Sequence, residues 1–183
     1  MPMNSYAVFL RGINVGGINI KMADLRSALA ERGFDGVKTL LASGNVALAS
    51  PLGAAALKKD VETCLRESFG YDAWVVVLTD ARLAALVEAC PYPAEDKTTH
   101  TYVTLSSDTA VLDELFEAGS RLDGTQQQRL GPEAMAWLAP AGGTLDSPFS
   151  RLSSKARYKS TTTTRNLRTM IKVRDATKAM GNG

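Results

Sequence analysis

The segment with the clearest chemical character runs from Arg11 to Gly17 and has the sequence Arg-Gly-Ile-Asn-Val-Gly-Gly. Its glycines permit backbone conformations in which amide groups approach a ligand closely, so the segment could cradle an anion or another polar group. Arg11 and Lys21 would add positive charge on either side. The alternative is a shaped turn that only joins a strand to a helix. The candidate ligand-binding residues of this segment are Arg11, Gly12, Asn14, Gly16, Gly17 and Lys21.

Two well-known nucleotide motifs are excluded for this segment. Gly12 and Gly17 have the spacing of a P-loop, but Ile18 and Asn19 occupy the positions where that motif requires Lys and Ser or Thr. The dinucleotide motif G-x-G-x-x-G fails as well, because position 14 is Asn. Nucleotide hydrolysis by the P-loop route is therefore rejected.

Two further segments could contribute to a binding site. Ser43, Gly44 and Asn45 lie between two β-prone runs, where they would form a hairpin turn if they have no other role. Thr164, Arg165 and Asn166 lead a strand into a helix. Asn166 is suited to cap that helix, whose first amide groups attract anions, and Arg165 and Lys155 add positive charge nearby in sequence. The alternative for this second segment is simple capping with a basic exposed helix face.

Residues typical of catalysis are few. His100 is the single histidine, and its position suggests an ordinary surface or strand-start residue. Cys64 and Cys90 continue helical stripes of apolar residues, so we expect both to be small buried side chains. No metal-ligand spacing, nucleophile elbow or carboxylate cluster occurs in the sequence. We therefore expect no metal and no cofactor, and the sequence favours a binding protein over an enzyme without deciding between them.

Positive charge is concentrated at the C-terminal end. Residues 151–183 carry nine basic side chains and one acidic side chain, residues 91–150 carry three and nine, and residues 1–90 carry nine of each. The basic segment could contact phosphates or nucleic acid, or it could fold back on the acidic block and neutralise it. No apolar run is long enough to span a membrane, and two cysteines with no targeting segment favour the cytoplasm.

Apolar periodicity predicts the same order of elements twice, strand-helix-strand-strand-helix-strand. The expected strands are Tyr6–Leu10, Val37–Ala42, Val46–Ala49 and Trp74–Leu78, then Thr101–Leu105, Gln126–Leu130, Ala134–Leu138 and Thr161–Thr164. Helices are expected from about residues 22, 54, 80, 108, 147 and 166. This order predicts an α+β protein of two ferredoxin-like (α-β plait) units, each an antiparallel sheet with its helices on one face.

A linker after Pro91 divides the two predicted units. The first would span residues 1–94 with an extra helix, and the second residues 95–183 with the basic C-terminal helix. Within the first unit we expect the loop at Arg11–Gly17 and the turn at Ser43–Asn45 to lie at opposite ends of neighbouring strands. The two segments would then form two patches, or one cleft completed by the second unit.

The segment Arg11–Gly17, followed by Lys21-Met22-Ala23-Asp24-Leu25, closely resembles the DUF1697 family of bacterial proteins. Ser43-Gly44-Asn45-Val46 and Thr163-Thr164-Arg165-Asn166 carry the same resemblance, which covers nearly the whole chain and is most specific over residues 6–50. It implies two ferredoxin-like units, and the family name brings no established activity. The family usually has an aromatic residue after the Arg-Asn pair, where this chain has Leu167, and its Ser-Lys pair corresponds to Ser154-Lys155.

Taken together, these features favour a cytoplasmic binding module for a small anionic ligand that bears phosphate or carboxylate. One alternative is an RNA- or DNA-binding protein that uses the basic C-terminal segment, with Arg168 and Lys172 along the phosphate backbone. Against it, neither unit has the aromatic strand motif of RNA-recognition domains. A second alternative is an enzyme of unrecognised mechanism. The sequence does not determine the oligomeric state or the ligand.

Overall fold

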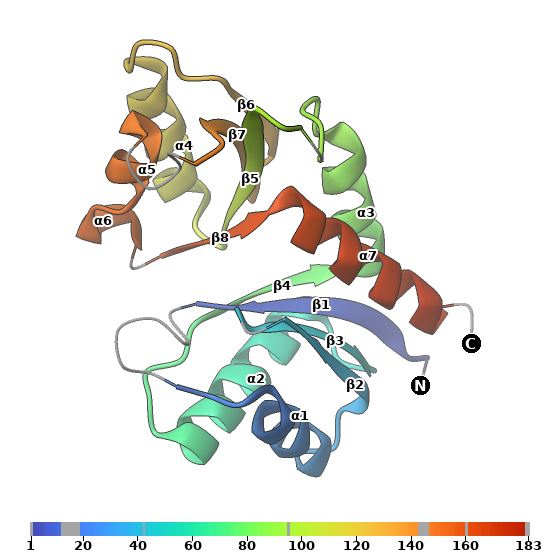
Figure 1. Cartoon of the computed structure of the whole chain (residues 1–183). Helices are drawn as coiled ribbons and strands as arrows, with labels where there is room; N and C mark the ends of the chain where they lie inside the picture. The colour runs from blue at the N-terminus through green and yellow to red at the C-terminus, as the bar shows by residue number, and fades with distance from the viewer. Residues whose placement is uncertain are drawn as a thin grey trace. The chain divides into compact units, whose positions relative to one another are not determined.

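The structure of the chain is a computed structural model that describes residues 2–11, 19–41, 43–94, 96–142, 147–159 and 161–181 (Figure 1). It divides into two compact units. Unit 1 comprises Met1–Ala84 together with Lys172–Gly183, and unit 2 comprises Ala85–Ile171. The sequence suggested one boundary near residue 94, with the whole C-terminal helix in the second unit. The end of that helix belongs instead to unit 1, where Met180 Cε lies 3.0 Å from the position that a Cβ on Gly36 would occupy.

Unit 1 contains one antiparallel sheet of four strands in the order β2-β3-β1-β4. Helices α1 and α2 lie on the same face of this sheet (Figure 1), as the ferredoxin-like order requires. The elements are β1 (Asn4–Leu10), α1 (Met22–Glu31), β2 (Asp35–Leu40), β3 (Asn45–Ser50), α2 (Ala54–Phe69) and β4 (Val75–Thr79), followed directly by α3 (Asp80–Ala89).

The core of unit 1 follows from the alternation of side chains along β1. Tyr6, Val8 and Leu10 point towards the helices and pack in one buried cluster with residues such as Leu25 and Leu57. The intervening side chains on the other face of the strand are buried as well. Burial on both faces explains why this strand reads as a continuous apolar run rather than as an alternating one.

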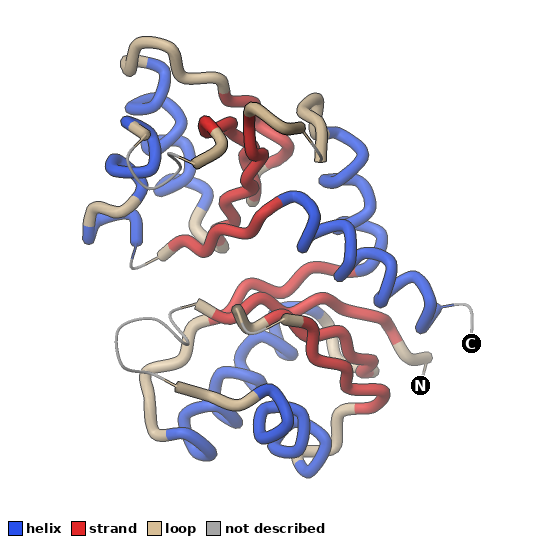
Figure 2. The backbone as a smooth tube through the Cα atoms, viewed as in Figure 1, coloured by secondary structure: helices blue, strands red, loops and turns tan. Residues whose placement is uncertain are grey.

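Unit 2 contains a second four-stranded antiparallel sheet in the order β6-β7-β5-β8 (Figure 2). Its elements are β5 (Thr99–Ser106), α4 (Thr109–Ser120), β6 (Gln127–Gly131), β7 (Ala134–Pro140), α5 (Pro148–Ser153), α6 (Ala156–Lys159) and β8 (Thr162–Asn166). Helix α7 (Leu167–Gly181) begins in unit 2, and its residues from Lys172 onward belong to unit 1. Two short helices, α5 and α6, replace the single second helix of unit 1.

Local capping explains where the helices of unit 2 begin. The Asp108 carboxylate accepts hydrogen bonds from the first amides of α4, and the Ser147 hydroxyl accepts one from Ser150 at the start of α5. Leu112, Trp137 and Phe149 then pack in one buried cluster between helices and sheet. The predicted α+β architecture with two antiparallel sheets is thus confirmed. Within the described residues, no helix is long and apolar enough to cross a membrane.

Candidate functional site

The end of β1 and the turn before β3 lie together at one end of the unit 1 sheet. The Leu10 amide donates to the Gly44 carbonyl oxygen at 2.9 Å, and Phe9 pairs with Asn45 in the strand register. The expectation that these two segments lie at opposite ends of neighbouring strands is therefore wrong. Because β1 and β3 run antiparallel, the last residue of one strand meets the first residue of the other.

The turn between β2 and β3 is held from inside by Asn45. Its side chain is fully buried, and its Nδ2 group donates to the Leu40 carbonyl oxygen and to Ser43 Oγ, both at 2.8 Å. Leu41 has a left-handed φ of 60°, uncommon for a residue with a branched side chain, and Gly44 has φ 86°. Ser43, Gly44 and Asn45 therefore have a structural role in this turn.

Arg11 follows β1 and lies beside the start of β4. Its amide donates to the Trp74 carbonyl oxygen at 3.2 Å. On α2, Glu62 is buried and accepts from the Val75 amide at 3.0 Å and from the Lys58 ammonium at 2.6 Å. The Lys58 ammonium also lies over the Trp74 ring, 5.3 Å from its centroid. This end of the sheet thus carries the positive charges of Arg11 and Lys58 and the negative charge of Glu62. The sequence patterns did not reveal this group.

Tyr71 belongs to the same group. Its hydroxyl oxygen is buried and, among the described residues, has no hydrogen-bond partner. Burial raises the pKa of Tyr71 to about 12, an effect that the positive charge of Arg11 opposes and the carboxylate of Glu62 reinforces. The hydroxyl therefore stays protonated and able to donate a hydrogen bond well above neutral pH.

The remaining candidates of the first unit are less informative. Lys21 is exposed and precedes α1, where its side chain makes no capping hydrogen bond. Gly12, Asn14, Gly16 and Gly17 lie outside the described residues.

In unit 2 the candidates Thr164, Arg165 and Asn166 are adjacent in sequence, but strand β8 places their side chains on two different faces of the sheet. Thr164 is exposed and shares a 2.9 Å hydrogen bond with Thr104, whereas Arg165 points to the opposite face and is 6% exposed. The guanidinium of Arg165 donates to Thr163 Oγ1 and to the Thr164 carbonyl oxygen, and burial lowers its pKa to about 10. Asn166 lies on the same face as Thr164, so a strand places only two of the three side chains together.

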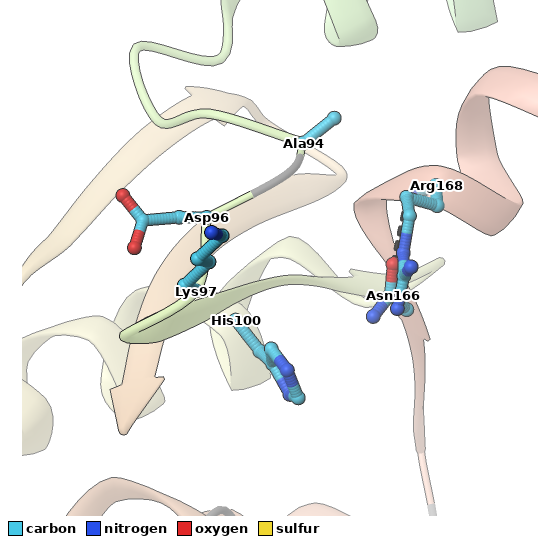
Figure 3. A pocket seen from close by; sticks show the side chains of 6 residues that line it. All are labelled: Ala94, Asp96, Lys97, His100, Asn166 and Arg168. Atoms are coloured by element: carbon cyan, nitrogen blue, oxygen red, sulfur yellow. Dashed lines mark hydrogen bonds between the residues drawn. The ribbon is translucent and has the colours of Figure 1, made fainter. Parts of the chain in front are cut away.

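Asn166 lines a pocket of about 380 Å³ in unit 2. Figure 3 shows Asn166 and Arg168 at the junction of β8 and α7, across from side chains of the segment that leads into β5 and of its first residues. The lining residues are Ala94, Asp96, Lys97, His100, Asn166 and Arg168. Asn166 Oδ1 accepts from the Arg168 amide at 2.8 Å and so caps α7, as its sequence position predicted.

The pocket combines basic groups with a helix N-terminus. Lys97 and Arg168 carry positive charge, and the ring nitrogens of His100 can form hydrogen bonds with a ligand. The first turn of α7 adds the partial positive charge of its amide groups. Asp96 is the acidic residue of the lining. Hydrogen bonds from the Thr98 side chain and amide, and from the Thr99 amide, lower the pKa of Asp96 and keep its carboxylate charged.

Sequence reasoning missed most of this pocket. His100 is indeed at the start of a strand, as expected, but it also faces the pocket. Lys97 is one of the three basic residues of the acidic block 91–150, and no pattern in the sequence singles it out. The pairing of Tyr102 with Asn166 brings the start of β5 to the end of β8, and this pairing is the signal that could have identified the pocket. Lys155 lies between α5 and α6, is exposed, and does not line it.

Several other candidates have structural roles. Leu167 is buried in the interior. It occupies the position where the family that the sequence resembles usually has an aromatic residue. Cys64 is buried and Cys90 is partly buried, and desolvation raises the pKa of both thiols. In the part of the chain that the structure describes, no group of three or more His, Cys, Asp or Glu side chains could hold a metal ion.

Two antiparallel sheets with ferredoxin-like strand order define an α+β protein of two plait units. The chain belongs to the DUF1697 family, described as proteins of unknown function, whose family model matches residues 3–135. This membership confirms the resemblance of the sequence motifs. None of the curated proteins matches this chain.

One solved structure supports the fold. A conserved bacterial protein, SP0830 from Streptococcus pneumoniae, is 22% identical, with a TM-score of 0.80 over 96% of this chain and 99% of that chain. At this identity the likeness establishes the shared fold alone. An unknown protein from Galdieria sulphuraria is 10% identical over 90% of this chain and 98% of its own, and its TM-score of 0.27 carries no argument.

Proposed function

We propose that this protein binds a small anionic ligand, bearing phosphate or carboxylate, in the pocket of unit 2. The observation that carries the proposal is the lining of that pocket, in which, among the residues that the structure describes, Lys97, His100 and Arg168 outnumber the acidic Asp96. A pocket of about 380 Å³ is in the range of small-molecule sites. The ligand would bring negative charge to a lining in which basic side chains predominate among the described residues.

The backbone supports the same ligand class. Helix α7 is fifteen residues long and begins at the pocket, so the partial positive charge of its N-terminus would favour a bound anion there. Asn166 fixes this end of the helix through its bond to the Arg168 amide. Arg168 can then offer a planar pair of donors to a carboxylate or phosphate, which is the recognition that guanidinium groups perform best.

Calorimetric titration with inorganic phosphate and with citrate tests this proposal. We expect saturable binding of at least one of the two, and a loss of about tenfold or more in affinity in Arg168→Gln, since a hydrogen bond to a charged group contributes about 1.5–3 kcal/mol. Lys97→Gln should weaken binding in the same direction.

Lys172→Gln is the matched control, because it removes the same charge one turn further along α7 from an exposed residue that does not line the pocket. Its affinity should stay within about twofold of the wild type, as exposed charges interact weakly across this distance. Equal binding by wild type and Arg168→Gln, or no binding of either anion, would contradict the proposal.

A second titration distinguishes the nucleic-acid alternative. Short RNA and DNA oligomers are added at low and at high salt, since binding through phosphates weakens steeply as salt rises. Salt-sensitive oligomer binding that Lys172→Gln and Arg168→Gln weaken equally would replace the pocket hypothesis by a phosphate-backbone contact along α7.

A further inference from the structure

We propose that the ligand of the unit 2 pocket carries hydroxyl groups beside its phosphate or carboxylate, as sugar phosphates and sugar acids do, and that Thr164 donates a hydrogen bond to one of them. This ligand class rests on the proposed function, since the ligand occupies the same pocket. Thr164 lies two residues before Asn166 on β8, on the face from which Asn166 lines the pocket (Figure 3).

Corresponding strands of the two units differ in chemical character. The pair β5 and β8 has the same place in its sheet as the pair β1 and β4 in the other. On the face of unit 1 that packs against the helices, the paired side chains are mainly apolar: Tyr6, Val8 and Leu10 opposite Thr79, Val77 and Val75. The corresponding positions of unit 2 form a polar row, in which every side chain carries a hydroxyl or amide group: Tyr102, Thr104 and Ser106 opposite Asn166, Thr164 and Thr162. Packing against helices alone would favour apolar side chains here, because buried polar groups are costly unless they are hydrogen-bonded.

The polar row is open to solvent at Thr164. In unit 1 the sixteen-residue helix α2 packs on the sheet, and Val77 is partly buried against the core. In unit 2 helices of six and four residues take its place, and the Thr162 hydroxyl donates to the Tyr158 carbonyl oxygen of α6 at 2.9 Å. Thr164, the next residue of β8 on this face, is exposed. A ligand that extends from the pocket along β8 therefore meets its hydroxyl.

A directed chain of hydrogen bonds ends at Thr164. Trp137 Nε1, which can only donate, donates to Thr104 Oγ1 at 3.0 Å. Thr104 is fully buried, and its hydroxyl lies 2.9 Å from that of Thr164. Among the described residues, Thr164 offers the acceptor for the Thr104 proton, so the buried hydroxyl donates to the exposed one. The Thr164 oxygen thus accepts from the protein, and its own proton is available to a ligand.

The spacing along β8 sets the reach of the ligand. Residues two apart on one face of a strand are roughly 7 Å apart, so the ligand would carry its hydroxyl at about this distance from its anionic group. The neighbours of Thr164 in the polar row, Tyr102, Thr104 and Asn166, are uncharged. A neutral hydroxyl therefore suits this end of the site better than a second anionic group, which would lose hydration there without gaining a cationic partner from this row.

Calorimetric titration with inorganic phosphate, butyl phosphate and ribose 5-phosphate tests this ligand class. Butyl phosphate has a chain of similar reach without hydroxyl groups, so it controls for size and apolar contact. We expect ribose 5-phosphate to bind about two- to tenfold more tightly than butyl phosphate, the range of one hydrogen bond between neutral groups. Pentanoate and gluconate give the same comparison for a carboxylate and show which anionic group the pocket takes.

Variants of Thr164 assign the preference to its hydroxyl. Thr164→Val keeps the branched shape and should abolish the preference, while its affinity for inorganic phosphate stays within about twofold of the wild type. Thr164→Ser keeps the hydroxyl and should retain the preference. Thr109→Val is the matched control, because Thr109 is an exposed threonine at the start of α4 and should affect none of the titrations. Arg168→Gln, in contrast, should weaken the binding of all the anions alike.

The outcomes separate this ligand class from the proposed function. If inorganic phosphate binds but the hydroxylated anions bind no more tightly than butyl phosphate and pentanoate, the ligand class is overturned and the proposed function stands. This comparison needs only the wild type, so it decides even if Thr164→Val, which deprives the buried Thr104 hydroxyl of its acceptor, fails to fold. A preference that persists in folded Thr164→Val also overturns the role of Thr164. If no anion binds in either arm, the proposed function fails and the ligand class fails with it.

Discussion

The backbone amide of Leu10 donates a 2.9 Å hydrogen bond to the carbonyl oxygen of Gly44 and so joins the end of β1 to the turn before β3. This bond places two segments of the family signature at one end of a single sheet. Ser43 and Asn45 hold the turn, while the amide of Arg11, directly after β1, donates to the Trp74 carbonyl oxygen. Described residues from both segments of the signature thus build the same end of the sheet.

The strained turn leads to the first prediction, that Leu41→Gly stabilises the protein. Leu41 has φ 60° and is 48% exposed, so the substitution removes a left-handed conformation that costs about 1–2 kcal/mol and loses little packing. We expect the free energy of unfolding in urea to rise by about 1 kcal/mol. Leu41→Ala keeps the strain and is the control. A gain of the same size in Leu41→Ala would show that φ is not the cause.

Asn45→Ala is predicted to destabilise the protein by about 2 kcal/mol. It removes two 2.8 Å hydrogen bonds from a fully buried side chain and leaves the Leu40 carbonyl oxygen without that donor. Urea denaturation of the variant measures the loss. Ser43→Ala, at an exposed position that supplies only one of the two acceptors, should cost less. If the two variants lost equal stability, Asn45 would not be the residue that holds the turn.

The architecture was predictable because it depends on local patterns. The apolar run Tyr6–Leu10 specified a buried strand, and the helix expected from about residue 54 is α2, which ends at Gly70 with φ 67°. The two antiparallel sheets follow from the order of such elements. The extent of unit 1 was not predictable from this order, because the unit includes Lys172–Gly183, a segment far in sequence from the rest of the unit.

The site was less predictable because it depends on pairing. Whether two loops share an end of a sheet is decided by the relative direction of their strands, and this was misjudged for β1 and β3. Arg165 and Asn166 are neighbours in sequence yet lie on opposite faces of β8. His100 and Tyr71 are single residues without a motif, and only the fold brings them beside basic groups.

Asp96→Asn is predicted to strengthen anion binding in the unit 2 pocket. Hydrogen bonds from Thr98 and Thr99 lower the pKa of Asp96, so its negative charge is present throughout the neutral range and opposes an anionic ligand. The amide oxygen of Asn can still accept from those backbone amides. We expect an affinity gain of about two- to threefold by calorimetry with phosphate, the size typical of an exposed charge interaction.

Asp123→Asn serves as the control for this experiment. It makes the same change in net charge as Asp96→Asn, but Asp123 lines a different pocket of unit 2. Its phosphate affinity should match that of the wild type. An equal gain in both variants would attribute the effect to overall charge rather than to the pocket.

Tyr71→Phe is predicted to reduce the loss of stability at alkaline pH. The folded-state pKa of Tyr71 is raised from 10.0 to about 12 by burial, so between these values the unfolded chain releases the phenolic proton while the folded protein keeps it. The folded state then binds more protons, and stability falls as pH rises through this window. The wild type should therefore show a steeper fall in urea midpoint than Tyr71→Phe.

Arg165 contributes with the opposite sign in the same range, because burial lowers its pKa to about 10 and the unfolded chain holds that proton longer. Its contribution is present in both proteins and cancels in the difference between them. Below pH 10 the variant should be as stable as the wild type or more stable, since it removes a buried hydroxyl without a partner among the described residues. Parallel curves above pH 10 would show that Tyr71 ionises equally in both states, and a less stable variant at neutral pH would show that the hydroxyl is already satisfied.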